Sequence, residues 1–135
     1  MKRRIKHVTV LGSGIMGSGI AAHFANIGVE VLLLDIVPFE LTDAETKKGL
    51  TKEDKTVRNR IATESLAKLV KSSPALLYKK EFANRISVGN FDDDLQKIKN
   101  TDWIIEVVVE RLDIKKSVYE KIEQYRKPGT LVSSN

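Results

Sequence analysis

The sequence predicts an α/β protein built on a doubly wound parallel sheet. Short apolar runs alternate along the chain with charged stretches in which apolar residues recur at helical spacing. Such alternation is typical of parallel strands joined by right-handed helical crossovers. A glycine-rich turn follows the first apolar run, residues 6–11, and Asp35 ends the second run. A strand, a glycine turn, a helix and a second strand within about 30 residues make one βαβ unit, so we expect the fold to begin there.

Three glycines in the turn have distinct physical tasks. Gly12 permits a tight turn, Gly14 lacks a Cβ and lets a pyrophosphate approach the backbone, and Gly17 lets the helix pack closely on the strand. The start of the helix would point free N–H groups and its positive dipole end at the phosphates. We therefore expect a dinucleotide site whose turn residues are Gly12, Ser13, Gly14, Ile15, Met16 and Gly17.

Asp35 lies 18 residues beyond Gly17, at the end of the second apolar run. A carboxylate at this place accepts both hydroxyls of an adenosine ribose and repels a 2′-phosphate, which favours NAD over NADP. The glycine pattern alone is weak evidence, but here a strand precedes it and a helix follows it. A glycine-rich turn in another α/β fold would leave Asp35 unexplained. The sequence therefore predicts a Rossmann-type sheet with NAD as the cofactor.

The remaining elements can be placed along the chain. Apolar runs predict strands over residues 6–11, 31–34, 85–88, 102–109 and 130–133. Helical spacing and boundary residues predict a first helix from Ile15 to the stop at Gly28, helices over 52–72 and 75–82, one after residue 94 and one capped by Asp113. Residues 38–83 are longer than an ordinary crossover. We expect them to form a helical excursion after the second strand.

Two groups of acids need a structural or functional explanation. Residues 92–94 are consecutive aspartates before a helix whose far end carries Lys97 and Lys99, an order of charges that matches the helix dipole. The ligand spacing of a calcium loop is missing, so no metal site is expected. Glu106 interrupts an apolar strand and has either a structural role inside the sheet or a place at the edge of the strand.

Composition indicates one soluble globular domain over residues 1–135, with 41% hydrophobic and 30% charged residues. The absence of cysteine excludes disulfides, thiolate catalysis and cysteine zinc sites. The net charge is +5, but the first residues supply four of these charges, so the rest is nearly neutral and nucleic acid is not an expected partner.

No apolar run is long enough to span a membrane. The basic start mimics a secretion signal, but the glycine turn that follows argues against one, and we expect a cytoplasmic protein.

Several segments together resemble the NAD-binding domain of the 3-hydroxyacyl-CoA dehydrogenases. These segments are the glycine turn and residues 34–35, 106–110, 112–116 and 131–135. The long middle section is most similar to bacterial fatty-acid-oxidation members that also carry an enoyl-CoA hydratase part. This family oxidises the 3-hydroxyl of an L-3-hydroxyacyl-CoA by hydride transfer to NAD, so the resemblance implies an NAD-dependent dehydrogenase of β-oxidation with an acyl-CoA substrate.

The resemblance also implies roles for residues outside the glycine turn. Glu110 and Lys115 occupy positions that line the cofactor on its nicotinamide side, and Asn135 lies at the nicotinamide pocket. In the helical excursion, Ser65 would donate to CoA, and Lys68 or Lys71 would meet its phosphate groups. For each of these three residues the alternative is an exposed place on an amphipathic helix.

No catalytic residue is expected within this chain. In the family the general base is a histidine in a downstream His-Phe-Phe-Asn-Pro-type segment, whereas His7 and His23 have no evident acid partner. The resemblance implies a chain truncated before a C-terminal helical domain, through which the full-length protein would form a homodimer. We expect the fragment to bind NAD without turnover. Two alternatives remain open: a 3-hydroxyacid dehydrogenase of the 6-phosphogluconate type, and a non-catalytic dinucleotide-sensing module.

Overall fold

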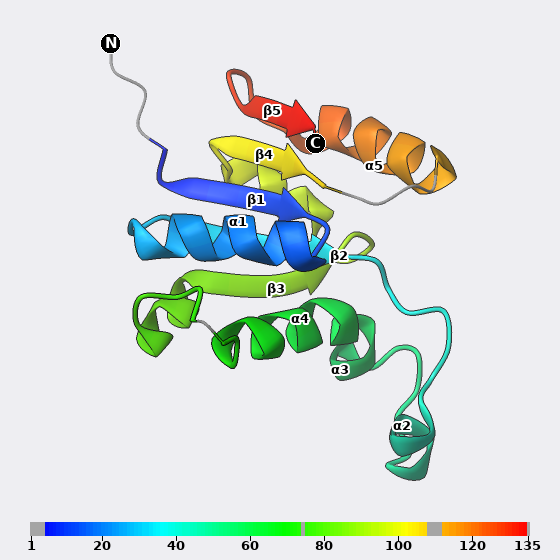
Figure 1. Cartoon of the computed structure of the whole chain (residues 1–135). Coiled ribbons are helices and arrows are strands. Elements are labelled where there is room, and N and C mark those ends of the chain that lie inside the picture. The colour runs from blue at the N-terminus through cyan, green and yellow to red at the C-terminus, as the bar shows by residue number, and fades with distance from the viewer. Residues whose placement is uncertain (1–4, 74, 108–111, 135) are drawn as a thin grey trace.

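In the part of the chain that the structure describes, five parallel strands form the sheet at the centre of the molecule (Figure 1). The structure, a computed structural model, describes residues 5–73, 75–107 and 112–134. The strands lie in the order β3-β2-β1-β4-β5, and each neighbouring pair is parallel. Their bounds are β1 His7–Leu11, β2 Glu30–Asp35, β3 Ile86–Asn90, β4 Trp103–Glu106 and β5 Leu131–Ser134. The predicted doubly wound parallel sheet is therefore confirmed.

Helices connect the strands and cover both faces of the sheet (Figure 1). The α-helices among the described residues are α1 Ile15–Asn26, α2 Asp43–Lys47, α3 Lys55–Arg58, α4 Arg60–Val70 and α5 Leu112–Tyr125. The 3₁₀-helices η1 Lys80–Arg85 and η2 Leu95–Asn100 accompany them. Within the described ranges, none of them has the length and apolar character needed to cross a membrane.

The two faces of the sheet bury separate apolar cores. Successive residues of a strand point to opposite faces, so Val8 and Val10 of β1 pack with α1 and α4, whereas Leu11 packs with η2 and α5. The strand β1 pairs with β2 on one side and β4 on the other. Its carboxyl end therefore lies at the middle of one sheet edge, and the glycine turn begins there.

The helix α1 packs unusually close to the end of β1. A Cβ on Gly17 would overlap the carbonyl oxygen of Gly12 and lie 3.1 Å from Cγ2 of Val107. Gly12 itself has a φ of 111°, a conformation that residues with a side chain rarely adopt. At the other end of α1, Gly28 has a φ of 89°, as expected of a residue that ends a helix. The predicted bounds of this helix are confirmed.

The helix predicted over residues 52–72 is divided in two by Asn59. The backbone there leaves helical geometry, with φ −96° and ψ 5°, between α3 and α4. The side chain of Asn59 accepts a hydrogen bond from Nδ2 of Asn90 at 2.7 Å, and the preceding Arg58 binds Asp93. These bonds to the end of β3 explain a break that local helix propensity could not predict.

The helix predicted over residues 75–82 is wrong. Residues 75–79 are not helical, and the 3₁₀-helix η1 begins only at Lys80. The side chain of Asn26, at the end of α1, donates to the carbonyl of Leu76 at 2.9 Å and accepts from the amide of Tyr78 at 2.8 Å. Backbone groups that a helix would use internally are thus bonded to α1.

The acids at residues 92–94 organise a turn rather than the start of an α-helix. Asp94 accepts a hydrogen bond from the amide of Asn90 at 2.9 Å, and the helix that follows, η2, is of the 3₁₀ type. Hydrogen bonds from Arg58 and Asn90 lower the pKa of Asp93. These contacts account for the acids, and no group of three or more candidate metal ligands occurs among the described residues.

The bounds of the third and fourth strands and the start of α5 also differ from the prediction. The third strand begins at Ile86 because η1 includes residue 85, and it continues to Asn90. The described part of the fourth strand ends at Glu106, and residues 108 and 109 of the predicted strand lie outside the described residues. The helix α5 begins at Leu112, so Asp113 lies within its first turn rather than before it.

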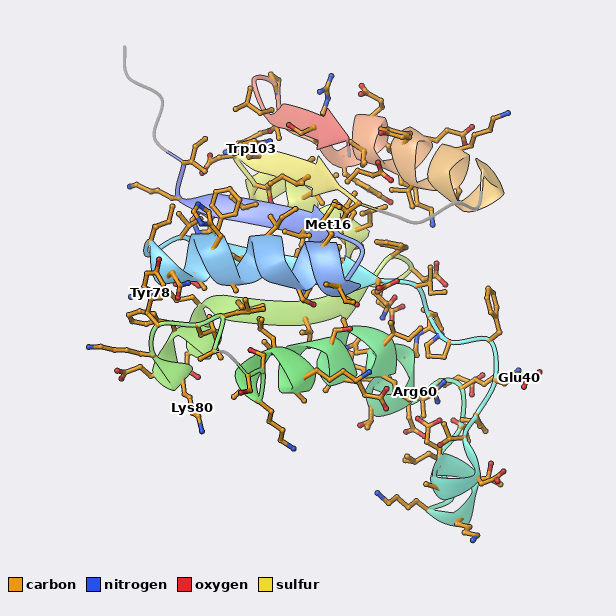
Figure 2. All side chains as sticks on the ribbon, viewed as in Figure 1. Met16, Glu40, Arg60, Tyr78, Lys80 and Trp103 are labelled. Carbon is orange, nitrogen blue, oxygen red and sulfur yellow. The ribbon has the colours of Figure 1, made fainter. Side chains whose placement is uncertain are left out.

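The α2 segment is attached to α4 by an ion pair. Arg60 at the start of α4 binds the buried carboxylate of Glu45 and donates to the carbonyl of Glu40 at 3.2 Å (Figure 2). Thr42 and Glu45 form a capping box at the start of α2. The amide of Thr42 and the charge of Arg60 outweigh burial and lower the pKa of Glu45.

Asp102 holds the amino-terminal edge of the sheet together. Its carboxylate accepts from the amides of Lys6 at 2.9 Å and His7 at 3.1 Å, and from Nζ of Lys127 at 3.0 Å. Partial burial opposes ionisation, but these donors outweigh it and lower the pKa of Asp102 from 3.8 to about 2.

Replacing Gly17 by alanine should destabilise the fold because the new methyl group meets backbone that cannot move aside. We expect a loss of about 3 kcal/mol in the free energy of unfolding, measured by urea denaturation. Gly19 lies two residues further along α1, and a Cβ added there would have no atom within 4 Å. Gly19→Ala should therefore be neutral or slightly stabilising, as alanine is in a helix interior. Equal effects of the two substitutions would contradict the close packing.

Asp102→Asn should lower the free energy of unfolding at pH 7 by about 1–2 kcal/mol, because charged hydrogen bonds are weakened. A depressed folded-state pKa gives stability that is present above the unfolded value of 3.8 and is lost as the pH falls towards 2. The difference between variant and wild type should thus vanish near pH 2 in denaturation curves. Glu30→Gln, at an exposed carboxylate on β2, serves as the control. A difference that stays constant with pH would contradict this role.

Candidate functional site

The turn between β1 and α1 offers an open backbone surface at the carboxyl edge of the sheet. Gly14 is the N-cap residue of α1, with φ −62° and ψ −170°. It is exposed, and an added Cβ would meet no atom within 4 Å. Met16 lies at the start of the helix (Figure 2) and is half exposed, while Ile15 is 97% exposed. The helix therefore begins with its amino end uncovered, as binding of a phosphate there requires.

Asp35 lies against this turn. Its Oδ2 accepts from the amide of Ser13 at 2.8 Å and from the Ser13 hydroxyl at 2.6 Å, and its Oδ1 accepts from the amide of Ile36 at 2.7 Å. A carboxylate has about four acceptor positions, so at least one remains for a ligand hydroxyl. Asp35, the predicted ribose-binding acid, is thus hydrogen-bonded to Ser13, which lies between Gly12 and Gly14 in the predicted pyrophosphate-binding turn.

A groove of about 260 Å³ joins the turn to α4. The hydroxyl of Ser65 on α4 lies 3.0 Å from that of Ser13, and both residues line the groove. The lining residues are Ser13, Gly14, Ile15, Ser18, Ser65, Lys68, Leu69, Ser72 and Leu76. Ser65 and Lys68, both proposed from the sequence, therefore lie beside the glycine turn. Lys71 follows the end of α4, is exposed, and is not among the lining residues.

A second pocket of about 180 Å³ lies beyond the end of β2. Its lining is mainly apolar, with a polar rim: Ile36, Val37, Phe39, Phe91, Asp92, Ser117, Val118 and Lys121. Phe39 is 64% exposed there. An apolar pocket of this kind suits a flat ring beside a ribose held by Asp35. Sequence analysis missed this pocket, although the apolar residues that continue past Asp35 were a signal for it.

Glu106 lies inside the sheet rather than at an edge. It pairs with Leu11 of β1 at the end of β4 and is fully buried. Tyr119 of α5 donates to its Oε2 at 3.3 Å. Of the two predicted positions, the interior one is therefore observed.

The remaining predicted residues lie on other elements or outside the described residues. Glu110 and Asn135 are outside the described residues, and Lys115 lies in the first turn of α5. His7 begins β1, at the edge of the sheet opposite Asp35. His23 is exposed in the last turn of α1, beside the ring of Phe24. Neither histidine is placed to reach a ligand at the glycine turn.

Known proteins resemble this chain in both sequence and fold. The family model described as "3-hydroxyacyl-CoA dehydrogenase, NAD binding domain" matches residues 7–135. A probable 3-hydroxyacyl-CoA dehydrogenase of Bacillus subtilis is 53% identical over 135 residues, and a putative fatty acid oxidation complex trifunctional enzyme of Rickettsia felis is 38% identical over 135 residues. The crystal structure of (S)-3-hydroxybutyryl-CoA dehydrogenase from Ralstonia eutropha superposes with a TM-score of 0.60 and 28% identity.

These relatives are much longer than this chain. The matches cover 100% of the chain but only 17% of the B. subtilis protein and 17% of the R. felis protein, and 98% of the chain but 41% of the R. eutropha structure. The family match spans nearly the whole chain and favours the acyl-CoA dehydrogenases over the 6-phosphogluconate type. On this evidence the chain belongs to the family of 3-hydroxyacyl-CoA dehydrogenase NAD-binding domains.

Proposed function

We propose that residues 1–135 form the NAD-binding unit of an L-3-hydroxyacyl-CoA dehydrogenase of fatty-acid β-oxidation. The observation that carries the proposal is the contact between Asp35 and the glycine turn. Both oxygens of the carboxylate are fixed by backbone amides, while the space above Gly14 stays open. A pyrophosphate over the turn and a ribose on Asp35 can therefore be bound at the same time.

The residues present fit NAD in three places. The uncovered start of α1 accepts the pyrophosphate, and residues 12–17 supply a backbone that a phosphate can approach. Asp35 keeps an acceptor position for the ribose hydroxyls, and its charge opposes the additional phosphate of NADP. The apolar pocket beside Phe39 accepts the adenine ring. When bound, NAD supplies the hydride acceptor of the reaction.

The groove beside α4 suits a phosphate-bearing substrate such as an acyl-CoA. Lys68 is exposed at its rim, and serine hydroxyls and apolar side chains line it. An ammonium on a long stem binds phosphate as an adjustable point charge. We assign CoA contacts to Ser65 and Lys68 on this basis. Lys71 does not line the groove, so of the two lysines we assign the phosphate contact to Lys68. Glu110, Lys115 and Asn135 keep their proposed places on the nicotinamide side.

The general base of the reaction is proposed to come from outside these 135 residues, because His7 and His23 are both remote from the turn. The isolated chain should therefore bind NAD without oxidising a hydroxyacyl-CoA. For the full-length protein we propose a cytoplasmic homodimer, formed through a C-terminal helical domain. A non-catalytic dinucleotide sensor would bind NAD equally well, but the full-length protein would then show no activity with acetoacetyl-CoA and NADH.

Asp35→Asn should weaken NAD binding about tenfold, because a charged hydrogen bond to ribose becomes a neutral one. The same change removes the repulsion of a 2′-phosphate, so the preference for NAD over NADP should largely disappear. Titration calorimetry of both dinucleotides against the 135-residue chain measures this. Asp43→Asn, at an exposed acid on α2, is the matched control. Wild-type chain that binds NADP more tightly than NAD would contradict the assignment.

Lys68→Gln should weaken binding of CoA, because one phosphate loses its ammonium partner. We expect a loss of about three- to tenfold at low ionic strength, decreasing as salt is added. Lys71→Gln is the matched control, since this lysine is exposed but does not line the groove. Calorimetric titration with CoA distinguishes the two. A larger effect at Lys71 would place the CoA phosphates elsewhere on the surface.

A further inference from the structure

The side chains of Ser65, Ser13 and Asp35 form a chain of hydrogen bonds from α4, through the glycine turn, to the end of β2. Ser65 lies 3.0 Å from Ser13, and Ser13 donates its hydroxyl to Oδ2 of Asp35 at 2.6 Å. Ser13 is only 2% exposed, whereas Ser65 is half-buried. The middle hydroxyl is therefore shielded from water and depends on these two neighbours for its side-chain hydrogen bonds. We call this series the serine relay.

The direction of hydrogen donation in the serine relay follows from chemistry. An ionised carboxylate only accepts hydrogen bonds, and a serine hydroxyl has a single hydrogen to donate. Because Ser13 gives its hydrogen to Asp35, it can only accept from Ser65. The relay thus runs from Ser65 through Ser13 to Asp35. A hydroxyl that accepts one hydrogen bond becomes a stronger donor of another, so Ser65 strengthens the contact between Ser13 and Asp35.

The serine relay controls one oxygen of the ribose-binding carboxylate. The amide of Ile36 holds Oδ1 from the strand itself, whereas Oδ2 is held by the amide and hydroxyl of Ser13. Rotation of the carboxylate would break two bonds to Ser13 at once. The acceptor position left for a ribose hydroxyl therefore has a direction that depends on Ser13, and through it on α4.

We propose that Ser65 is a positioning residue for NAD, acting through Ser13 to orient Asp35 towards the adenosine ribose. The inference rests on the NAD binding proposed above and adds a contribution from α4, a helix that reaches Asp35 through Ser13. It also limits the role of Ser65 in CoA binding. Its hydrogen is already donated to Ser13, so a phosphate in the groove can take it only by breaking the serine relay.

The experiment measures the dissociation constants, for the 135-residue chain, of NAD and of an analogue whose adenosine ribose lacks both the 2′- and the 3′-hydroxyl. Ser65→Ala should weaken NAD about fivefold, the effect of one lost hydrogen bond, and Ser13→Ala about tenfold or more. Both variants should bind the analogue as wild type does, within about twofold, because the analogue lacks both hydroxyls that Asp35 could accept. Ser65→Thr keeps a hydroxyl at this position and should restore NAD binding.

Ser73→Ala, at an exposed serine just beyond α4, is the matched control and should change neither constant. Equal weakening of NAD and analogue by Ser65→Ala would mean a merely structural role and would overturn the inference. An unchanged NAD constant in Ser65→Ala would overturn it as well, while the NAD site itself would stand. Wild-type chain that binds no NAD would overturn both proposals, and should Ser13→Ala fail to fold, Ser65→Ala alone decides.

Discussion

The close approach of α1 to the end of β1 is the constraint on which the rest of the site depends. Gly17 lies against the carbonyl of Gly12, where no side chain could be accommodated. The amide of Gly12 in turn donates to the carbonyl of Leu34 at 2.8 Å, so the turn is also bonded to β2. With both contacts in place, the start of α1 and the end of β2 have a fixed separation. A dinucleotide can then be bound by two elements without rearrangement of either.

Local sequence predicted those parts of the fold that depend on local geometry. The positive φ of Gly12, the helix stop at Gly28 and the alternation of apolar strands follow from backbone sterics and hydrophobic periodicity within a few residues. The parallel direction of the strands followed from their alternation with helices. The position of Asp35 beside the turn was predictable for the same reason, because both lie at carboxyl ends of neighbouring parallel strands.

The errors arose where distant side chains decide the backbone. Asn59 breaks a helix because its side chain binds Asn90, and residues 75–79 are not helical because Asn26 takes their backbone groups. No propensity within either segment carries this information. The role of Ser13 was missed for a related reason. The glycine pattern leaves the residue at this position unspecified, and the value of its hydroxyl depends on Ser65, 52 residues away in the sequence.

The placement of Ser65 follows from how α4 is attached at its two ends. At its start, Arg60 binds the buried carboxylate of Glu45, and the neighbouring Asn59 binds Asn90 at the end of β3. Near its other end, Leu69 is buried with α1 and the sheet. Polar bonds fix the position of one end along the helix axis, since they are directional, while the apolar contact keeps the helix against α1. A residue halfway between them is thereby held at a set distance from the glycine turn. The long segment after β2, which has no part in the basic βαβ unit, consequently contributes to the geometry of the cofactor site.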